Sequence, residues 1–249
     1  MAIKVLVNGA FGRMGQLVTK AVKDDAALEL VGQTGREYEL KRAILDSGAA
    51  VVVDFTHPDA VYANTVAIIE SGAAPVIGTS GLKKEEINQL QALCEKRQLS
   101  GIIVPNFSIA AVLMMQCAKN IASHLHTVEI IEMHHEQKLD SPSGTALRTA
   151  QLIAEARGGS ALPSGKKTHA QLSDEALYAR GFCYEGVPIH SVRMPGVLAK
   201  QTVIFGGLGE TLAICHENIQ RESFMPGVCY ACKKVLGLGR LAYGLEEIL

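Results

Sequence analysis

Over residues 1–108, short apolar runs alternate with longer segments of helical spacing, and this alternation constrains the fold more than any other feature. The apolar runs are rich in Val and Ile and are bounded by Gly, Pro or polar residues, as is typical of strands buried on both faces of a sheet. They occupy residues 3–7, 28–31, 51–55, 75–77 and 102–104, and helical spacing occupies residues 13–23, 38–46, 59–70 and 83–96. This alternation predicts a parallel sheet with right-handed crossover helices.

The pattern changes after Ser108. We expect a long apolar helix at 109–124, a strand at 127–133, a helix that opens near Ser143, and a last helix at 226–236 that packs on the first helix of the chain. Further strands are expected at 190–193, 198–205 and 211–216, the last two joined by the Gly-Gly-Leu-Gly segment 206–209, and residues 158–167 predict a loop. The fold class is therefore α/β, with a second α+β domain on an antiparallel or mixed sheet.

Composition excludes several classes of partner. A net charge of −1 over 249 residues gives no excess of positive charge for binding nucleic acid or an anionic membrane. Aromatic residues make up only 5% of the chain, which argues against binding nucleic-acid bases by stacking. Residues 1–7 run directly into a strand without signal-peptide features, and no stretch of 18 apolar residues occurs, so we expect a cytoplasmic protein.

The six cysteines are scattered through the chain, which favours reduced thiols over a disulfide framework. Cys229 and Cys232 form a C-x-x-C motif inside a helical run. With no second pair nearby, packing is favoured over metal binding or redox chemistry.

The segment that follows the first expected strand is rich in glycine and opens a helix. It reads Gly9, Ala10, Phe11, Gly12, Arg13, Met14 and Gly15. Glycine lets the backbone approach a pyrophosphate, and the helix N-terminus offers N–H groups and partial positive charge, so this loop predicts a dinucleotide site. The spacing Gly-x-x-Gly-x-x-Gly departs from the usual Gly-x-Gly-x-x-Gly, and a tight turn that merely needs glycine is the alternative.

Further strand ends are expected at the same crevice, because ligands bind beyond the carboxyl ends of parallel strands. Arg36 follows the second strand and can pair with the 2′-phosphate of NADPH, whereas Glu37 could still contact the ribose of NADH. The hypothesis is therefore that the protein uses NADPH and tolerates NADH. A solvated surface charge is the alternative for Arg36. The ends of the fourth and fifth strands supply Gly78, Thr79, Ser80, Val104, Pro105, Asn106 and Phe107.

The segment from Glu132 to Ala146 places two imidazoles and an ammonium at a strand exit, followed by a Ser-Pro-Ser-Gly-Thr helix start. N–H groups of Gly144 and Thr145 can hold a carboxylate. His135 and Lys138 can supply positive charge, and His134 or Lys138 can transfer a proton. One alternative is a metal site formed by the two histidines and a nearby Glu, which is disfavoured because adjacent residues of a strand point to opposite faces. The other alternative is a polar surface loop followed by a capped helix.

The pattern Glu-x-His-His-x-x-Lys-x-Asp-x-Pro-Ser-Gly-Thr-Ala resembles the signature of the 4-hydroxy-tetrahydrodipicolinate reductase family of lysine and diaminopimelate biosynthesis. The likeness extends to the glycine loop and to segments 54–56, 78–80 and 106–108, so it covers most of the chain. The resemblance implies a Rossmann-like dinucleotide-binding domain at 1–108 and 222–249, a substrate-binding and oligomerisation domain at 109–221, and a homotetramer built through the second sheet. NADPH or NADH would be the cofactor, and no metal is expected.

Carried over by position, the resemblance implies that His134 and Lys138 transfer protons. His135, Ser143, Gly144 and Thr145 would contact the substrate carboxylates, and Arg221 stands where the family has an Arg, in a loosely matching context. Ser141 replaces a more usual Ala, and the loop after the second strand lacks an acid at the expected place.

Two other functions fit the sequence less well. A semialdehyde-type dehydrogenase would need a nucleophilic Cys with a His partner, but Cys94 and Cys117 fall within expected helices. A dinucleotide-sensing protein without chemistry would keep the glycine loop, yet it would have no use for His134, His135 and Lys138 together.

Overall fold

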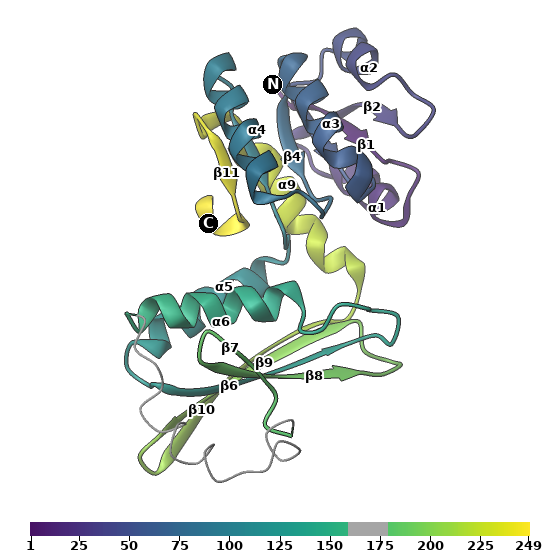
Figure 1. The fold of residues 1–249 in the computed structure, drawn as a ribbon. Coiled ribbons are helices and arrows are strands. Elements are labelled where there is room, and N and C mark those ends of the chain that lie inside the picture. The colour runs from purple at the N-terminus through teal and green to yellow at the C-terminus, as the bar shows by residue number, and fades with distance from the viewer. Residues whose placement is uncertain (159–178) are drawn as a thin grey trace. The chain divides into compact units, whose positions relative to one another are not determined.

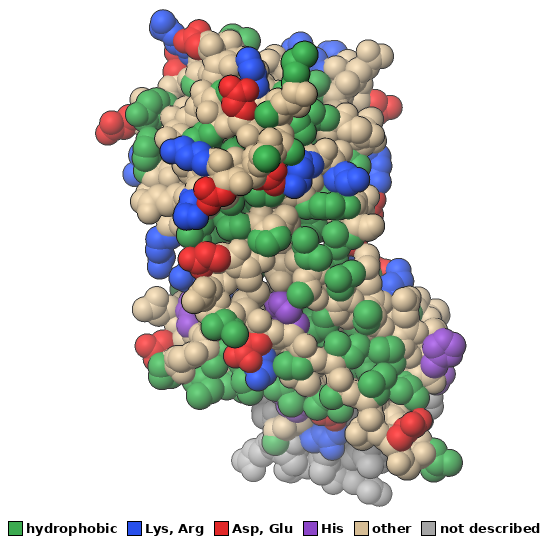
Figure 2. Space-filling view, turned by 180° about the vertical axis from the view of Figure 1, so that it is seen from behind, with side chains coloured by type: hydrophobic (Ala, Val, Ile, Leu, Met, Phe, Trp, Pro, Cys, Tyr) green, Lys and Arg blue, Asp and Glu red, His purple; other side chains and the backbone are tan. Residues whose placement is uncertain are grey.

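A computed structural model of the chain describes residues 1–158 and 179–249. The chain divides into two compact units: unit 1 comprises Met1–Ile109 and Arg221–Leu249, and unit 2 comprises Ala110–Gln220. The expected loop at 158–167 lies, beyond Gly158, outside the described residues. On the face seen in Figure 2, acidic and basic side chains are interspersed over unit 1, and hydrophobic side chains gather over unit 2.

Unit 1 is built on a six-stranded, fully parallel sheet in the order β11-β5-β4-β3-β1-β2 (Figure 1). Its strands are β1 (Ile3–Asn8), β2 (Leu28–Thr34), β3 (Val51–Asp54), β4 (Ala74–Ile77), β5 (Gly101–Ile103) and β11 (Leu241–Tyr243). The direction of strand addition reverses between β1 and β3, and in open parallel sheets such a switch point opens a crevice at the carboxyl ends of the strands.

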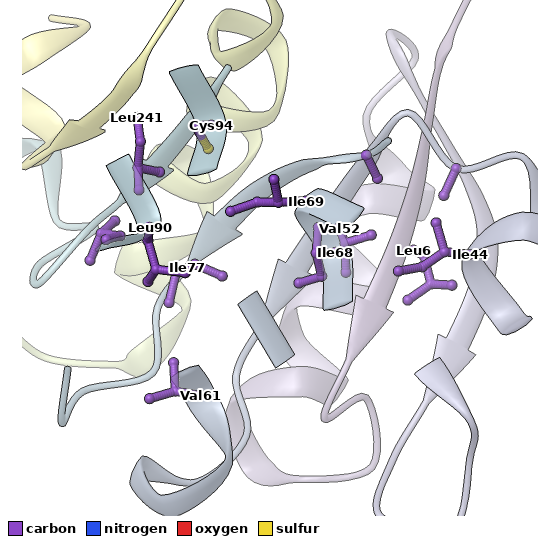
Figure 3. Close-up of a cluster of buried hydrophobic side chains, with 13 residues drawn as sticks. Leu6, Ile44, Val52, Val61, Ile68, Ile69, Ile77, Leu90, Cys94 and Leu241 are labelled. Carbon is purple, nitrogen blue, oxygen red and sulfur yellow. The ribbon is translucent and has the colours of Figure 1, made fainter. Parts of the chain in front are cut away.

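Helices cover this sheet and close its core. They are α1 (Arg13–Asp24), α2 (Leu40–Ser47), α3 (Pro58–Glu70), α4 (Lys84–Arg97) and α9 (Met225–Lys234), with short 3₁₀ turns at Arg221–Phe224, Val235–Gly237 and Leu245–Glu247. Leu6, Val52 and Ile77 from the strands meet Ile68 and Leu90 from the helices in one buried cluster (Figure 3). Each such side chain contributes roughly 1.5–3 kcal/mol when fully buried. Helix α9 packs against α1, as expected.

Unit 2 carries a five-stranded mixed sheet in the order β10-β9-β6-β8-β7. Its elements are α5 (Ile109–Ala122), β6 (Thr127–His134), α6 (Gly144–Ala156), β7 (Phe182–Tyr184), β8 (Val187–Arg193), β9 (Ala199–Gly207) and β10 (Glu210–Asn218). Strands β6 and β8 run parallel and the other pairs are antiparallel. Figure 1 shows α5 and α6 over one face of this sheet. The expected fold class is confirmed, including the β9–β10 hairpin.

The structure corrects several expected boundaries. Strand β2 continues to Thr34, because its second half pairs with β1 beyond a register shift at Val5/Leu6. Val104 lies just after β5, the helix expected at 109–124 ends at Ala122, and that expected at 226–236 ends at Lys234. Strands β7 and β11 were not expected; at three residues each they are too short to show a period.

Candidate active site

The glycine loop between β1 and α1 contains glycines of two kinds. Gly9 has φ +81, and a Cβ there would collide with the carbonyl oxygen of Phe55. A Cβ on Gly15 would collide with the carbonyl oxygen of Gly9. A Cβ on Gly12, in contrast, would find its nearest neighbour, Gly9 O, at an ordinary 3.4 Å. The turn itself therefore explains Gly9 and Gly15 but not Gly12, whose missing side chain leaves a cradle that a pyrophosphate fits.

The start of α1 is suited to an anion. Gly12 is its N-cap and supplies no capping side chain, and no acidic residue occurs in the first turn. Ala10 is buried beneath the loop, whereas Phe11, Gly12 and Arg13 are exposed. The first N–H groups of a helix attract negative charge when no side chain caps them.

A buried polar network lies at the carboxyl ends of β1, β2, β3 and β4. Its centre is Asp54, which is fully buried. Oδ2 accepts from Asn8 Nδ2 at 2.8 Å and Asn64 Nδ2 at 3.1 Å. Oδ1 accepts from Thr79 Oγ1 at 2.6 Å, Thr56 Oγ1 at 2.8 Å and Thr56 N at 3.2 Å. Asn8 Oδ1 in turn accepts from Thr34 Oγ1, at the end of β2, at 2.9 Å. The network therefore joins four strand ends at the predicted cofactor crevice.

The remaining predicted cofactor residues line the same strand ends. Arg36 is exposed just beyond β2, and near it Phe11 stacks on Tyr38 with ring centroids 6.0 Å apart. A Cβ on Gly78 would lie 2.9 Å from the Phe107 ring, so glycine is needed there. Met14 lies in the first turn of α1, and Ser80, Val104, Pro105 and Asn106 lie in the loops after β4 and β5. Asn106 Oδ1 accepts from Ser108 N at 2.9 Å.

In unit 2, the end of β6 holds a buried carboxylate against an imidazole. Glu132 is fully buried, and its Oε2 lies 2.6 Å from Nδ1 of His134. Arg193, at the end of β8, binds the same carboxylate at both oxygens, with Nη1 to Oε2 and Nη2 to Oε1 each at 2.9 Å. The N–H of Ser143, the N-cap of α6, donates to Oε1 at 3.2 Å. Glu132 thus joins the strand exit to the helix start.

The electrostatics of Glu132 follow from these contacts. Burial acts to raise its pKa, but hydrogen bonds from His134, Arg193 and Ser191 outweigh burial and lower the pKa to about 2. Asp140 accepts from Lys138 Nζ at 2.7 Å on both oxygens, and this hydrogen bond lowers the Asp140 pKa. Both carboxylates are therefore ionised at neutral pH.

The predicted substrate residues other than Arg221 gather in the same part of unit 2. His134 ends β6, His135 and Lys138 follow it, and Ser143 Oγ accepts the N–H of Ala146 at 3.2 Å as the cap of α6. Gly144 is the first helical residue, and a Cβ on it would meet no described atom within 4 Å, so the space beside it is open. Arg221 opens a 3₁₀ turn in unit 1. The proton donors, the lysine cation and the N-terminus of α6 could together bind a carboxylate substrate and protonate it.

Sequence reasoning missed the roles of Asp54, Glu132 and Arg193. The alternation along β6 places Glu132 on the buried face with Val128 and Ile130, and an acid at such a position signals a paired carboxylate. Arg193 carried no local signal, since its partner lies 61 residues away.

Other chemistry finds less support among the described residues. No group of three His, Cys, Asp or Glu side chains there is placed to hold a metal ion. All six cysteines are free thiols. Burial raises the pKa of Cys94 to about 11, and Cys229 and Cys232 are buried with pKa values raised by burial, so these three are poor nucleophiles. No described helix has the length and hydropathy needed to cross a membrane.

Comparison with known proteins places this site in a family. The family model described as dihydrodipicolinate reductase, N-terminus, matches residues 3–107, and that described as dihydrodipicolinate reductase, C-terminus, matches residues 110–249. Proteins named 4-hydroxy-tetrahydrodipicolinate reductase from Legionella pneumophila strain Paris and Coxiella burnetii strain Dugway 5J108-111 are each 49% identical, over 100% of both chains.

A solved structure agrees with these sequence matches. Dihydrodipicolinate reductase from Paenisporosarcina sp. TG-14, solved with dipicolinate bound, superposes with a TM-score of 0.88 at 38% identity, covering 100% of each chain. Sequence, family models and fold thus agree along the whole length, and the chain belongs to the dihydrodipicolinate reductase family.

Proposed function

We propose that the protein reduces 4-hydroxy-tetrahydrodipicolinate to tetrahydrodipicolinate with NADPH or NADH, a step of lysine and diaminopimelate biosynthesis. Replacing the 4-hydroxyl by hydrogen balances as one hydride and one proton added and one water lost. The observation that carries the proposal is the cluster in unit 2, where His134 and Lys138 stand beside the open start of α6. The names of the full-length relatives support the same reaction.

The dinucleotide fits unit 1. The cradle at Gly12 and the uncapped start of α1 would hold the pyrophosphate, and the loops at Gly78–Ser80 and Val104–Phe107 would hold the nicotinamide end. When bound, the nicotinamide supplies the hydride. Arg36 is exposed where the adenosine ribose is expected and favours NADPH through its charge, with NADH as the second cofactor.

The dicarboxylate fits unit 2. Gly144 and Thr145 at the start of α6 would receive one carboxylate, Ser143 caps that helix, and His135 adds a further polar contact. His134 and Lys138 are the groups that can deliver a proton to the ring carbon next to the hydride acceptor. Arg221, in unit 1, is a further candidate for an anion contact, as the family pattern implies.

We also propose a homotetramer joined through the sheet of unit 2. On β6, Ile131 and Met133 are half-buried on the face opposite Val128, Ile130 and Glu132. Register places Val192 beside Met133, so Ile131, Met133 and Val192 form an apolar strip on this face, with His190, Thr202 and Lys200 at its border. Light scattering should give a molar mass of about four chains. A cytoplasmic location is supported by the six free thiols, which persist in reducing compartments.

Turnover tests the main proposal. NADPH absorbance should fall when purified protein receives 4-hydroxy-tetrahydrodipicolinate, and kcat should drop roughly 10²–10⁴-fold in Lys138→Ala with NADPH affinity unchanged. Lys138→Arg keeps the charge but cannot usefully donate a proton, so it should also be slow. Cofactor binding without turnover would instead identify a dinucleotide-sensing protein, and a fast Lys138→Arg would leave His134 as the donor.

A further inference from the structure

The strongest feature outside the assigned residues is the ion pair of Glu132 with Arg193. Both side chains are largely withdrawn from solvent, at 0% and 19% exposed, and both carboxylate oxygens are bound by the guanidinium at 2.9 Å. The same carboxylate contacts His134 Nδ1 and the Ser143 N–H. Burying an ion pair costs free energy of desolvation unless its hydrogen bonds are complete. Its position beside His134 therefore suggests that the pair has a function there.

We propose that Glu132 and Arg193 are positioning residues with opposite effects on how tightly His134 holds its proton. Glu132 holds the proton on Nδ1, which leaves Nε2 as the nitrogen that exchanges protons with substrate, and Arg193 neutralises Glu132 so that His134 can release its proton. The proposal rests on the proposed reductase function for the use of that proton. The tautomer and the charge balance are properties of unit 2 alone.

The charge balance decides what each residue does. A buried carboxylate facing a histidine alone would hold the imidazolium tightly, and a proton donor must lose its proton once per turnover. With Arg193 bound at both oxygens, Glu132 carries its own countercharge before His134 is protonated. Other ions nearby are already paired: Lys138 with Asp140 at 2.7 Å, and Lys200 on β9 with Glu217 at 3.1 Å. His135, the next residue, is a further titratable neighbour.

Arg193 also fixes the loop that carries Lys138. Its guanidinium makes five hydrogen bonds, one for each N–H group. Two go to Glu132, Nη1 also donates to Val192 O at 2.8 Å, Nε donates to Lys138 O at 3.3 Å, and Nη2 donates to Asp140 O at 2.7 Å. The same side chain therefore sets the balance at His134 and clamps the backbone on both sides of Leu139.

NMR titration of the imidazole nitrogens tests directly whether the two residues shift the titration midpoint of His134 in opposite directions. In Glu132→Gln the titration midpoint of His134 should fall by about one to two pH units, and the neutral tautomer should lose its preference for Nδ1–H. In Arg193→Gln the midpoint should rise by about one pH unit. The His134 resonances are assigned by their loss in His134→Gln.

The chain offers a matched control on the same sheet. Glu129 Oε2 lies 2.9 Å from His190 Nε2, and its Oε1 accepts from Arg180 Nη2 at 3.0 Å. Glu129→Gln should shift the titration of His190 and leave that of His134 unchanged. Circular dichroism and thermal melting establish that each variant is folded.

Arg193→Lys separates charge from clamping. The lysine keeps the countercharge but loses the carbonyl contacts, so the His134 midpoint should stay near that of the unmodified protein while KM for the dicarboxylate rises several-fold. If Arg193→Gln does not fold, this variant and Glu132→Gln still decide the matter. Equal midpoints in all folded variants, or shifts of the same sign in Glu132→Gln and Arg193→Gln, would overturn the proposal.

Kinetics provide a second arm. The pH profile of kcat should move to lower pH in Glu132→Gln and to higher pH in Arg193→Gln. A protein that does not reduce the dicarboxylate would fail this arm while the NMR titrations still behave as expected, so failure of the reductase function is distinguishable from failure of the positioning role. Normal turnover with an unshifted profile in both variants would refute the role.

Discussion

Replacing Asp54 by Ala should destabilise unit 1 and weaken dinucleotide binding together. The substitution removes the acceptor of five hydrogen bonds. Asn64 and the Thr56 hydroxyl are only half-buried and can reach water, and Thr56 N retains Thr79 Oγ1 at 2.7 Å. Thr79 Oγ1 can still donate to the backbone carbonyl oxygen of residue 54 at 3.3 Å, whereas the Nδ2 donor of Asn8, a residue 4% exposed, loses its acceptor.

The magnitude follows from the Asn8 donor. An unsatisfied buried donor costs about 1–3 kcal/mol, so Asp54→Ala should lower the free energy of unfolding by about that amount. For a chain of this size that corresponds to a fall in Tm of roughly 2–12 °C. Asp54→Asn should cost less, because both threonine hydroxyls can turn to accept its amide N–H groups and mainly charge assistance is lost.

Thermal melting and NADPH titration measure both effects. Asp46→Ala is the matched control, since Asp46 is 73% exposed in a surface pair with Arg42 and should change stability by less than about 0.5 kcal/mol. The Kd for NADPH should rise about tenfold or more in Asp54→Ala, because the ends of β1, β3 and β4 lose their common tie. If Asp54→Ala melts with the unmodified protein and binds NADPH normally, the network contributes nothing and the reasoning fails.

Other substitutions test the remaining assignments. Gly12→Val should abolish NADPH binding while the melting temperature is nearly kept, since its Cβ meets only an ordinary contact in the protein; normal binding would mean that the loop is only a turn. Arg36→Ala should weaken NADPH roughly ten- to hundred-fold and NADH little, and equal losses in both titrations would rule out a 2′-phosphate contact. Thr145→Val should raise KM for the dicarboxylate with kcat little changed, whereas a fall in kcat alone would mean that Thr145 contacts the substrate only in the transition state. Because the Glu132 pKa is lowered from 4.5 to about 2, its ionised form contributes about 3 kcal/mol that is complete above pH 4.5 and lost as pH falls through 2. The stability gap between the unmodified protein and Glu132→Gln in urea should therefore narrow on acidification, and a gap independent of pH would contradict the lowered pKa.

The elements predicted well from sequence are those with a strong period and clear ends. Helix α1 begins at Arg13 as expected, because Gly9 has φ +81 and Gly12 is extended, so helical backbone starts only after them. Strand β2 was cut short because Gly32 and Gln33 read as a loop, whereas pairing with β1 keeps them extended. That pairing is a tertiary effect, which local propensity does not contain.

The candidate site shows the same division. His134, Lys138 and the Ser143 cap lie close together in sequence, so their motif was visible. Glu132 lay inside that motif, but its role depends on Arg193, and residues so far apart in sequence meet only through the parallel pairing of β6 with β8. Asp54 likewise depends on Asn8 and Thr79, which arrive from neighbouring strands.

The pairing of β11 with β5 imposes an order on how the chain becomes a folded molecule during synthesis. Residues 110–220 form one continuous segment, so unit 2 can complete its core while the ribosome is still adding residues 221–249. Unit 1 cannot, because α9 and β11 have yet to emerge, and until then β5 presents an open parallel edge with Ile102 and Ile103. Chaperone contacts on the nascent chain should therefore concentrate on the earliest-made half and persist longest there.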